Sequence, residues 1–294
     1  MQNFRFVRSS DETGQIGSAL DKAKAPTRCD RRFVLTGLSG FLAMAMTGKL
    51  RSALAAGEPE AAATRIATDT VVYQGRKQQL KAFMARPKPV SGKRPGVVII
   101  HEIRGLNGHF RDLARKLALE GFIAMVPDLT SGQGYAQEGS DEVRDFLQKM
   151  TPLEIAAEYQ VAIDRLRADP DCSGNIGIIG FAWGGAAAAD LAAAPAKPIK
   201  AAVLYYSLPT SIELVPKFNA AVQLHYAEQD QHTQPQIDPI EKKLIGYSKI
   251  YEQYTYEGAK PNFANESLPK WYNKAAAMLA WDRTIMFLKR QLGG

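Results

Sequence analysis

The chain has 294 residues, enough for one large α/β domain or two small ones. It carries 37 Lys and Arg against 30 Asp and Glu, but nine of these basic and only four of these acidic residues fall within the first 55 positions. The remainder, with 28 basic and 26 acidic residues, is close to neutral. This balance predicts no nucleic-acid-binding surface.

The first 55 residues have the features of an export signal. Arg31 and Arg32 precede an apolar, glycine-containing run at residues 37–47, and the small-x-small pattern Ala53-Leu54-Ala55 follows. The run is about half of the roughly 20 apolar residues that a membrane span requires. A buried helix is the alternative, but its glycines would make it a poor one.

We therefore expect residues 1–55 to be a cleaved twin-arginine signal and residues 56–294 to be the mature domain. The mature chain is expected in the periplasm or another extracytoplasmic compartment, without a membrane span. Of the two cysteines only Cys172 lies outside the signal, so no intramolecular disulfide can form. The sequence contains no metal-ligand cluster, and we expect neither a metal nor an organic cofactor.

Apolar runs alternate with amphipathic stretches through the rest of the chain. The predicted strands are residues 70–73, 80–86, 97–100, 122–126, 176–179, 201–205, 221–226 and 249–256. The predicted helices are residues 106–120, 153–168, 183–194, 237–246 and 271–292. With no internal repeat or interdomain linker, this alternation predicts a single α/β domain built on one doubly wound, mostly parallel sheet.

The strand at residues 176–179 runs directly into the motif Gly180-x-Ala182-x-Gly184. Its spacing is that of the G-x-S-x-G turn of α/β-hydrolases, whose central residue presents the nucleophile at the top of the sheet. Here the central residue is Ala182, and a methyl group cannot attack a carbonyl. An ordinary tight strand-to-helix turn is the alternative interpretation.

Several further segments, each at the end of a predicted strand, resemble the dienelactone hydrolase family. They are His101-Glu102-Ile103-Arg104-Gly105-Leu106-Asn107, Pro127-Asp128, Leu224-His225-Tyr226-Ala227-Glu228-Gln229-Asp230 and Tyr256-Glu257-Gly258-Ala259-x-x-x-Phe263-x-Asn265. The final segment, residues 269–284, resembles the closing helix of that family. The resemblance covers residues 66–290 and implies a single α/β-hydrolase domain that hydrolyses small lactones or esters through an acyl-enzyme.

The resemblance also implies a catalytic site in which two positions are substituted. Ala182 stands at the nucleophile position, where the family has Cys, and Pro261 at the base position, where the family has His. Neither residue can perform that chemistry. Asp230 is implied as the acid that would orient the base, and Glu102 as the carboxylate that would help to activate the nucleophile.

The groups implied in substrate binding are intact. The backbone N–H groups of Trp183 and Ile103 are implied as an oxyanion hole. Arg104 and, less directly, Arg144 are candidates to bind a carboxylate. The expected partner is therefore a small lactone, ester or carboxylate.

Other nucleophiles and bases are weaker candidates. We expect His109 and His232 at the surface, although either could approach the site, and His225 in the core. Ser207 ends a strand on the catalytic side but has no identified base. Cys172 is expected at the end of its strand that lies away from the site.

Two functions stay open on the sequence alone. One is a pseudoenzyme that keeps the ligand pocket, and the other is a hydrolase of activated esters or lactones in which Glu102 or Asp230 activates water. A single engineered substitution would explain Ala182 but not Pro261, so the two losses together favour a natural origin.

Overall fold

The computed structural model describes residues 65–135, 137–194 and 198–293. Residues 1–55, where we predict the export signal, lie outside this range. The described strands are β1 (Ile66–Gln74), β2 (Gln79–Pro87), β3 (Arg94–Ile100), β4 (Ile123–Asp128), β5 (Cys172–Phe181), β6 (Ala201–Tyr205), β7 (Ala221–Ala227) and β8 (Tyr251–Tyr256). The helices are α3 (Gly108–Leu119), α4 (Asp141–Lys149), α5 (Pro152–Arg167), α6 (Trp183–Ala192), η1 (Ile212–Lys217), α7 (Gln234–Gly246) and α8 (Lys274–Leu292).

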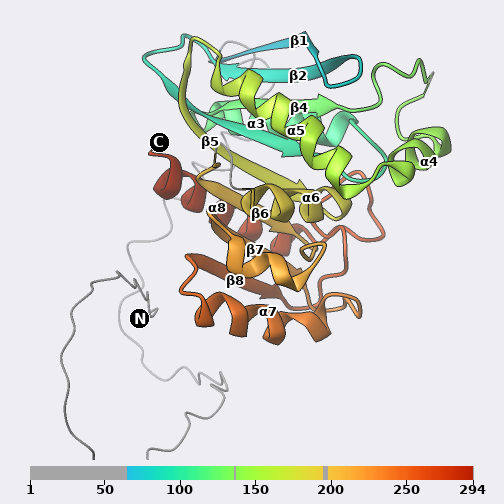
Figure 1. The fold of residues 1–294 in the computed structure, drawn as a ribbon, viewed down its shortest axis with the longest axis vertical. Coiled ribbons are helices and arrows are strands. Elements are labelled where there is room, and N and C mark those ends of the chain that lie inside the picture. The colour runs from blue at the N-terminus through green and yellow to red at the C-terminus, as the bar shows by residue number, and fades with distance from the viewer. Residues whose placement is uncertain (1–64, 136, 195–197, 294) are drawn as a thin grey trace, which may run out of the picture. The chain divides into compact units, whose positions relative to one another are not determined.

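The strands form one eight-stranded sheet in the order β1-β2-β4-β3-β5-β6-β7-β8 (Figure 1). The β1–β2 and β2–β4 pairs are antiparallel, and every pair from β4 to β8 is parallel. The prediction of a doubly wound, mostly parallel sheet is confirmed. Because parallel strands end at the same edge, the segments that follow β3, β5, β6, β7 and β8 share one side of the molecule.

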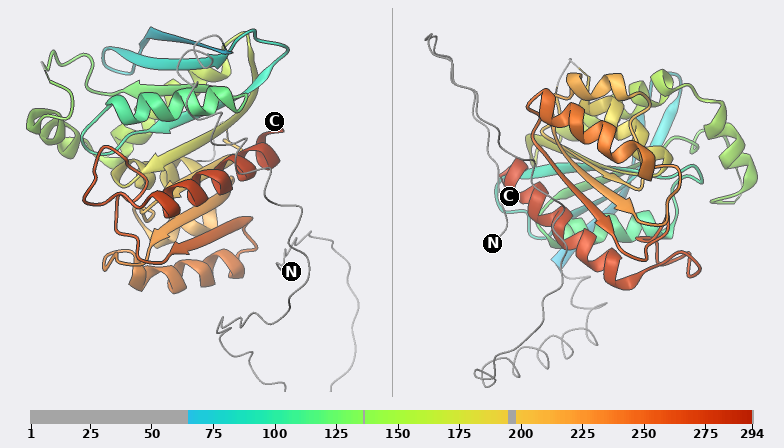
Figure 2. Two further views of the ribbon diagram at one scale, coloured as in Figure 1. Left: turned by 180° about the vertical axis from the view of Figure 1, so that it is seen from behind. Right: turned by 90° about the horizontal axis from the view of Figure 1, so that it is seen from below.

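Helices cover both faces of the sheet. Helices α3 and α8 lie on one face, and α5, α6 and α7 lie on the other (Figures 1 and 2). Residues along β3 alternate between the two cores that result, with Val98 and Ile100 in one and Val97 and Ile99 in the other. This burial on both faces explains why the parallel strands read as continuous apolar runs.

Several predicted boundaries differ from the structure. Strand β1 is longer than residues 70–73 because all of Ile66–Gln74 pairs with β2 in a hairpin. Helix α8 begins at Lys274, where the Asn273 side chain accepts a hydrogen bond from the backbone of Ala276. Helix α4 was not predicted, although Ser140 caps it and acidic residues occupy its first turn.

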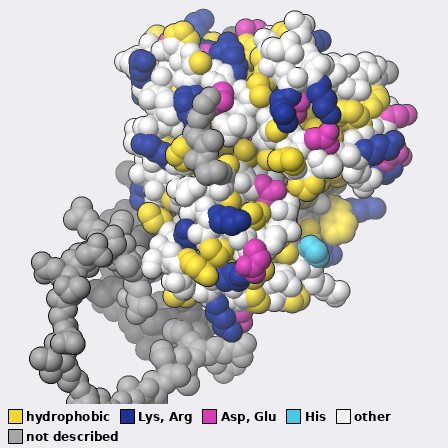
Figure 3. Space-filling model, viewed as in Figure 1, with side chains coloured by type: hydrophobic (Ala, Val, Ile, Leu, Met, Phe, Trp, Pro, Cys, Tyr) yellow, Lys and Arg dark blue, Asp and Glu magenta, His cyan; other side chains and the backbone are white. Residues whose placement is uncertain are grey.

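The helices and the surface of the described part bear on two questions, membrane insertion and the clustering of charge. No helix within the described ranges is both long and apolar enough to cross a membrane. Basic and acidic side chains are interspersed over the face drawn in Figure 3.

Candidate active site

The turn between β5 and α6 has the geometry of a nucleophile elbow. Ala182 has φ of 47° and ψ of −113°, a conformation that residues with a Cβ rarely adopt. A Cβ on Gly180 would lie 2.3 Å from the carbonyl oxygen of Gly184, and one on Gly184 would lie 2.4 Å from that of His101. The strand and helix therefore approach too closely for any other residue at these two positions.

Hydrogen bonds hold the elbow in place. The Ala182 N–H donates to the carbonyl oxygen of Tyr205 at 3.0 Å. The Ser207 hydroxyl donates to the carbonyl oxygen of Ala182 at 2.7 Å. The positive φ of Ala182 costs on the order of 1–3 kcal/mol, which these hydrogen bonds help to offset. Ser207 therefore supports the elbow, and its hydroxyl proton is already engaged.

Glu102 lies in the segment after β3, partly buried beside the loop that follows β8. Its Oε1 accepts a hydrogen bond from Asn265 Nδ2 at 3.4 Å. Burial raises the pKa of the Glu102 carboxyl, and Arg104 and Asn265 oppose this effect. The buried Tyr206 lies near Glu102 and is also strained, with φ of 40°. A carboxylate with a raised pKa is thus retained near the elbow.

Asp230 follows β7 and is buried, with 7% of its surface exposed. Its Oδ1 accepts hydrogen bonds from the backbone N–H groups of His232 at 3.0 Å and Thr233 at 3.3 Å. The carboxylate therefore stabilises the turn that leads into α7. This structural task does not depend on an imidazole.

The loop that carries Pro261 lies beside the loop that carries Asp230. The Gln229 N–H donates to the carbonyl oxygen of Ala259 at 2.9 Å, and the Gly258 N–H donates to Glu228 Oε2 at 2.8 Å. Pro261 begins the turn after Ala259 and is partly buried. The base and acid positions implied by the resemblance are thus on adjacent loops.

The two arginines implied in carboxylate binding have partners within the protein. Arg104 donates to the carbonyl oxygen of Gly139 at 2.8 Å and lies 3.6 Å from Asp141. Arg144 pairs with Asp141 at 2.9 Å and with Asp145 at 2.8 Å. Both guanidinium groups therefore meet acidic side chains at helix α4.

The two residues implied in the oxyanion hole lie on different elements, one at the start of a helix and one in the segment after a strand. Trp183 is the first residue of α6, where a backbone N–H has no acceptor within the helix. Ile103 is partly buried against the core, and its segment follows β3. Trp183 stacks over His101 at a ring-centroid distance of 6.1 Å. The indole therefore packs on the same segment that contributes Glu102.

A cavity of about 680 Å³ opens beside the elbow. Ala182 and Trp183 line one side, and the segment after β6 together with the start of α7 lines the rest, including the exposed His232. The sequence offered no sign that residues 208–212 would contribute to this wall. That contribution follows from the course of the chain between β6 and η1.

The other histidines lie in the core. His225 in β7 bonds to the Tyr256 hydroxyl at 2.7 Å, and burial lowers its pKa to about 3. His109, expected at the surface, is instead buried with its ring against Phe110 and Phe181. Burial lowers the pKa of His109 to about 4. Cys172 is buried at the start of β5, at the end opposite the elbow.

The family model for the dienelactone hydrolase family matches residues 80–292, which include every element of this site. The chain belongs to the dienelactone hydrolase family. A Bradyrhizobium relative, named as a probable 2-oxo-3-(5-oxofuran-2-ylidene)propanoate lactonase, is 29% identical over 254 residues, which cover 78% of this chain and 96% of the relative. An Escherichia coli K12 relative, named as a candidate carboxymethylenebutenolidase, is 28% identical over 229 residues, which cover 73% of this chain and 83% of the relative.

Solved structures agree on the fold. A dienelactone hydrolase-like promiscuous phosphotriesterase from metagenomic libraries superimposes with a TM-score of 0.69 at 22% identity, covering 77% of this chain and 99% of the other. At this identity the likeness shows the α/β-hydrolase fold alone.

Proposed function

We propose that this protein is a pseudoenzyme of the dienelactone hydrolase family that binds a small lactone or ester without forming an acyl-enzyme. The observation that carries the proposal is Ala182, which holds the strained elbow conformation beside an open cavity but has no nucleophilic atom. Pro261 at the base position supports the same conclusion, because its side chain has no group that accepts a proton.

A second candidate function rests on Glu102. Burial raises the pKa of its carboxyl, which makes the carboxylate a stronger base than an exposed one. In that case Glu102 would activate water, and the N–H of Trp183 would stabilise the oxyanion. Asp230 is a less favourable candidate for this role, because its Oδ1 already accepts hydrogen bonds from two backbone N–H groups.

One experiment separates the two functions. The purified chain is titrated with a neutral lactone by calorimetry, and its turnover of an activated aryl ester is measured in parallel. Binding without turnover supports the pseudoenzyme. Turnover that falls by about 100-fold in Glu102→Gln, but not in the matched Glu257→Gln variant at an exposed site, establishes the hydrolase. Asp230→Asn tests the other carboxylate.

We further propose that the protein is exported through the twin-arginine route. The support is the sequence of residues 31–55, with paired arginines, a short apolar run and a small-x-small pattern. Replacing Arg31 and Arg32 with Lys should leave the precursor in the cytoplasm, as judged by fractionation and N-terminal sequencing. Continued export of that variant would refute the assignment.

A further inference from the structure

The cavity beside Ala182 is lined without any formally charged side chain. Among the described residues that form its wall there is no Asp, Glu, Lys or Arg. The polar groups that line it are neutral hydroxyls and an amide, and its titratable side chains are His232 and the phenol of Tyr206. They include Ser207, Thr210, Ser211 and Gln236.

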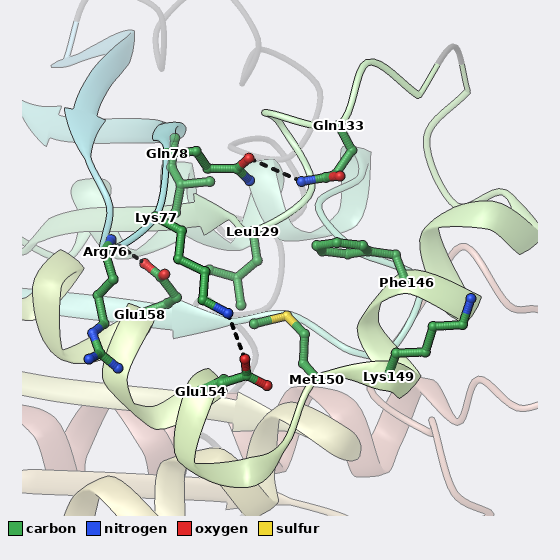
Figure 4. Close-up of a pocket in the computed structure, with 11 residues that line it drawn as sticks. Arg76, Lys77, Gln78, Leu129, Gln133, Phe146, Lys149, Met150, Glu154 and Glu158 are labelled. Atoms are coloured by element: carbon green, nitrogen blue, oxygen red, sulfur yellow. Dashed lines mark hydrogen bonds and ion pairs between the residues drawn. The ribbon is translucent and has the colours of Figure 1, made fainter.

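A second hollow, of about 330 Å³, is smaller than the elbow cavity and yet is lined by charged side chains. It lies between the β1–β2 turn and helices α4 and α5 (Figure 4). Its wall includes five charged residues, and Lys77 Nζ pairs with Glu154 Oε1 at 2.7 Å. The absence of charged side chains from the wall of the elbow cavity is therefore not a consequence of cavity size.

Three carboxylates lie close to residues of the elbow cavity wall. Thr210 donates its hydroxyl proton to Asp190 at 2.6 Å, and Asp230 accepts from the backbone of His232. The Glu102 carboxylate lies near Tyr206 and further raises the pKa of its hydroxyl. Each of these carboxylates would repel an anion in the cavity.

The arginines that could have compensated an anion are committed elsewhere. Arg104 and Arg144 both pair with Asp141, and neither lines the cavity. Burying a carboxylate without a cation is costly, whereas a neutral carbonyl or amide needs only one or two hydrogen bonds. The thermodynamic preference is therefore for uncharged ligands.

We propose that the elbow cavity selects neutral ligands, such as lactones, esters and amides, and excludes the carboxylates of the same shape. This inference rests on the proposed binding function and specifies its ligand class. The Ser207 and Thr210 protons are engaged within the protein, so the Ser211 hydroxyl and the Gln236 amide supply the hydrogen bonds to the ligand carbonyl. Ser211 is well placed for this, because its oxygen accepts from the Glu213 backbone and leaves its proton free to donate.

The test compares phenylacetamide with phenylacetate, which have the same shape and differ in charge. Calorimetry on the full chain at pH 8 should show the amide binding at least about 10-fold more tightly. Phthalide and 2-(hydroxymethyl)benzoate form a second pair. Equal or tighter binding of the carboxylates would overturn the inference and leave the binding function intact. No binding of either pair would overturn both.

A charge-adding variant provides the control. Gln236→Arg places a guanidinium in the cavity wall and should improve phenylacetate binding by about 10-fold. Gln231→Arg adds the same charge at an exposed position outside the wall and should leave both affinities unchanged. An equal gain in both variants would show that net charge, rather than the cavity, controls selection, and would overturn the inference.

Discussion

The elbow and the loops at the implied acid and base positions are held in place by different interactions. At the elbow the backbone keeps its strained form, with Ala182 at φ of 47° and two glycines in close contact with neighbouring backbone. On the other side, Pro261 occupies a turn that keeps its backbone bond between Gln229 and Ala259. The elbow geometry is imposed by the close approach of α6 to β5 and to the end of β3, whereas the implied base position is on a loop.

Both carboxylates at the site also have structural partners. Asp230 stabilises the turn into α7, and Glu102 bonds to Asn265 across the two loops. Both therefore contribute to the fold without a catalytic partner.

The largest expected effect comes from placing a nucleophile and a base at the two substituted positions. The double variant Ala182→Cys with Pro261→His should hydrolyse activated esters at least about 100-fold faster than either single variant, because a thiolate and its base act as one unit. Steady-state turnover of an aryl ester measures the effect.

The control for this restoration is Ala182→Ser with Pro261→His, which replaces the thiol with a weaker nucleophile. If all variants fold but remain equally inactive, the loop at Pro261 has moved away from the elbow. The two regions would then have lost their spatial relationship as well as their chemistry.

Packing at the elbow predicts a large loss of stability. Gly184→Ala would place a Cβ 2.4 Å from the His101 carbonyl oxygen, so we expect a loss of about 3 kcal/mol or more. Urea unfolding measures it. In the matched control Gly246→Ala the new Cβ meets nothing within 4 Å, and stability should be unchanged or slightly higher. Equal effects at the two sites would contradict the argument.

Acid should lower the free energy of unfolding, because one buried histidine packs beside the elbow and another lies close to the loops at the implied acid and base positions. His109 packs against Phe181 before the elbow and His225 bonds to Tyr256 at the end of β8, with pKa values lowered to about 4 and about 3. The unfolded chain, in which histidine titrates near 6.5, binds more protons between these values, so stability is complete above about pH 6.5 and falls as the pH decreases.

The expected slope is up to about 1.4 kcal/mol per pH unit for each buried histidine. Urea unfolding between pH 7 and pH 5 measures it. The slope should decrease in His109→Leu and remain in His232→Gln, where the replaced ring is exposed. A slope unaffected by His109→Leu would show that this ring becomes protonated in the folded state.

The sequence predicted the sheet well because its parallel strands are buried on both faces, as Val97–Ile100 are. It missed α4, a short helix in which only Val143 and Leu147 are buried. The family motifs ordered along the chain were enough to predict that the segments of Glu102, Ala182 and Asp230 share an edge, since each follows a parallel strand.

The partners of the site residues could not be predicted in the same way. Arg104 and Arg144 meet Asp141, which belongs to the helix that the sequence did not reveal. The burial of His109 depends on Phe181 from another strand. Such contacts arise from tertiary packing, and no local pattern reports them.

The smallest effect concerns the strain at Ala182 itself. Ala182→Gly should remove the cost of a Cβ at positive φ. The greater entropy of glycine in the unfolded chain offsets part of this stabilisation, so the free energy of unfolding should rise by up to about 1 kcal/mol. The matched control is Ala186→Gly, because Ala186 lines the same cavity but lies within regular α6. Its free energy of unfolding should fall by about 1 kcal/mol. Opposite signs in urea unfolding would show that the elbow is strained where the helix beside it is not. A loss at both positions would mean that contacts of the Ala182 methyl group outweigh its backbone strain.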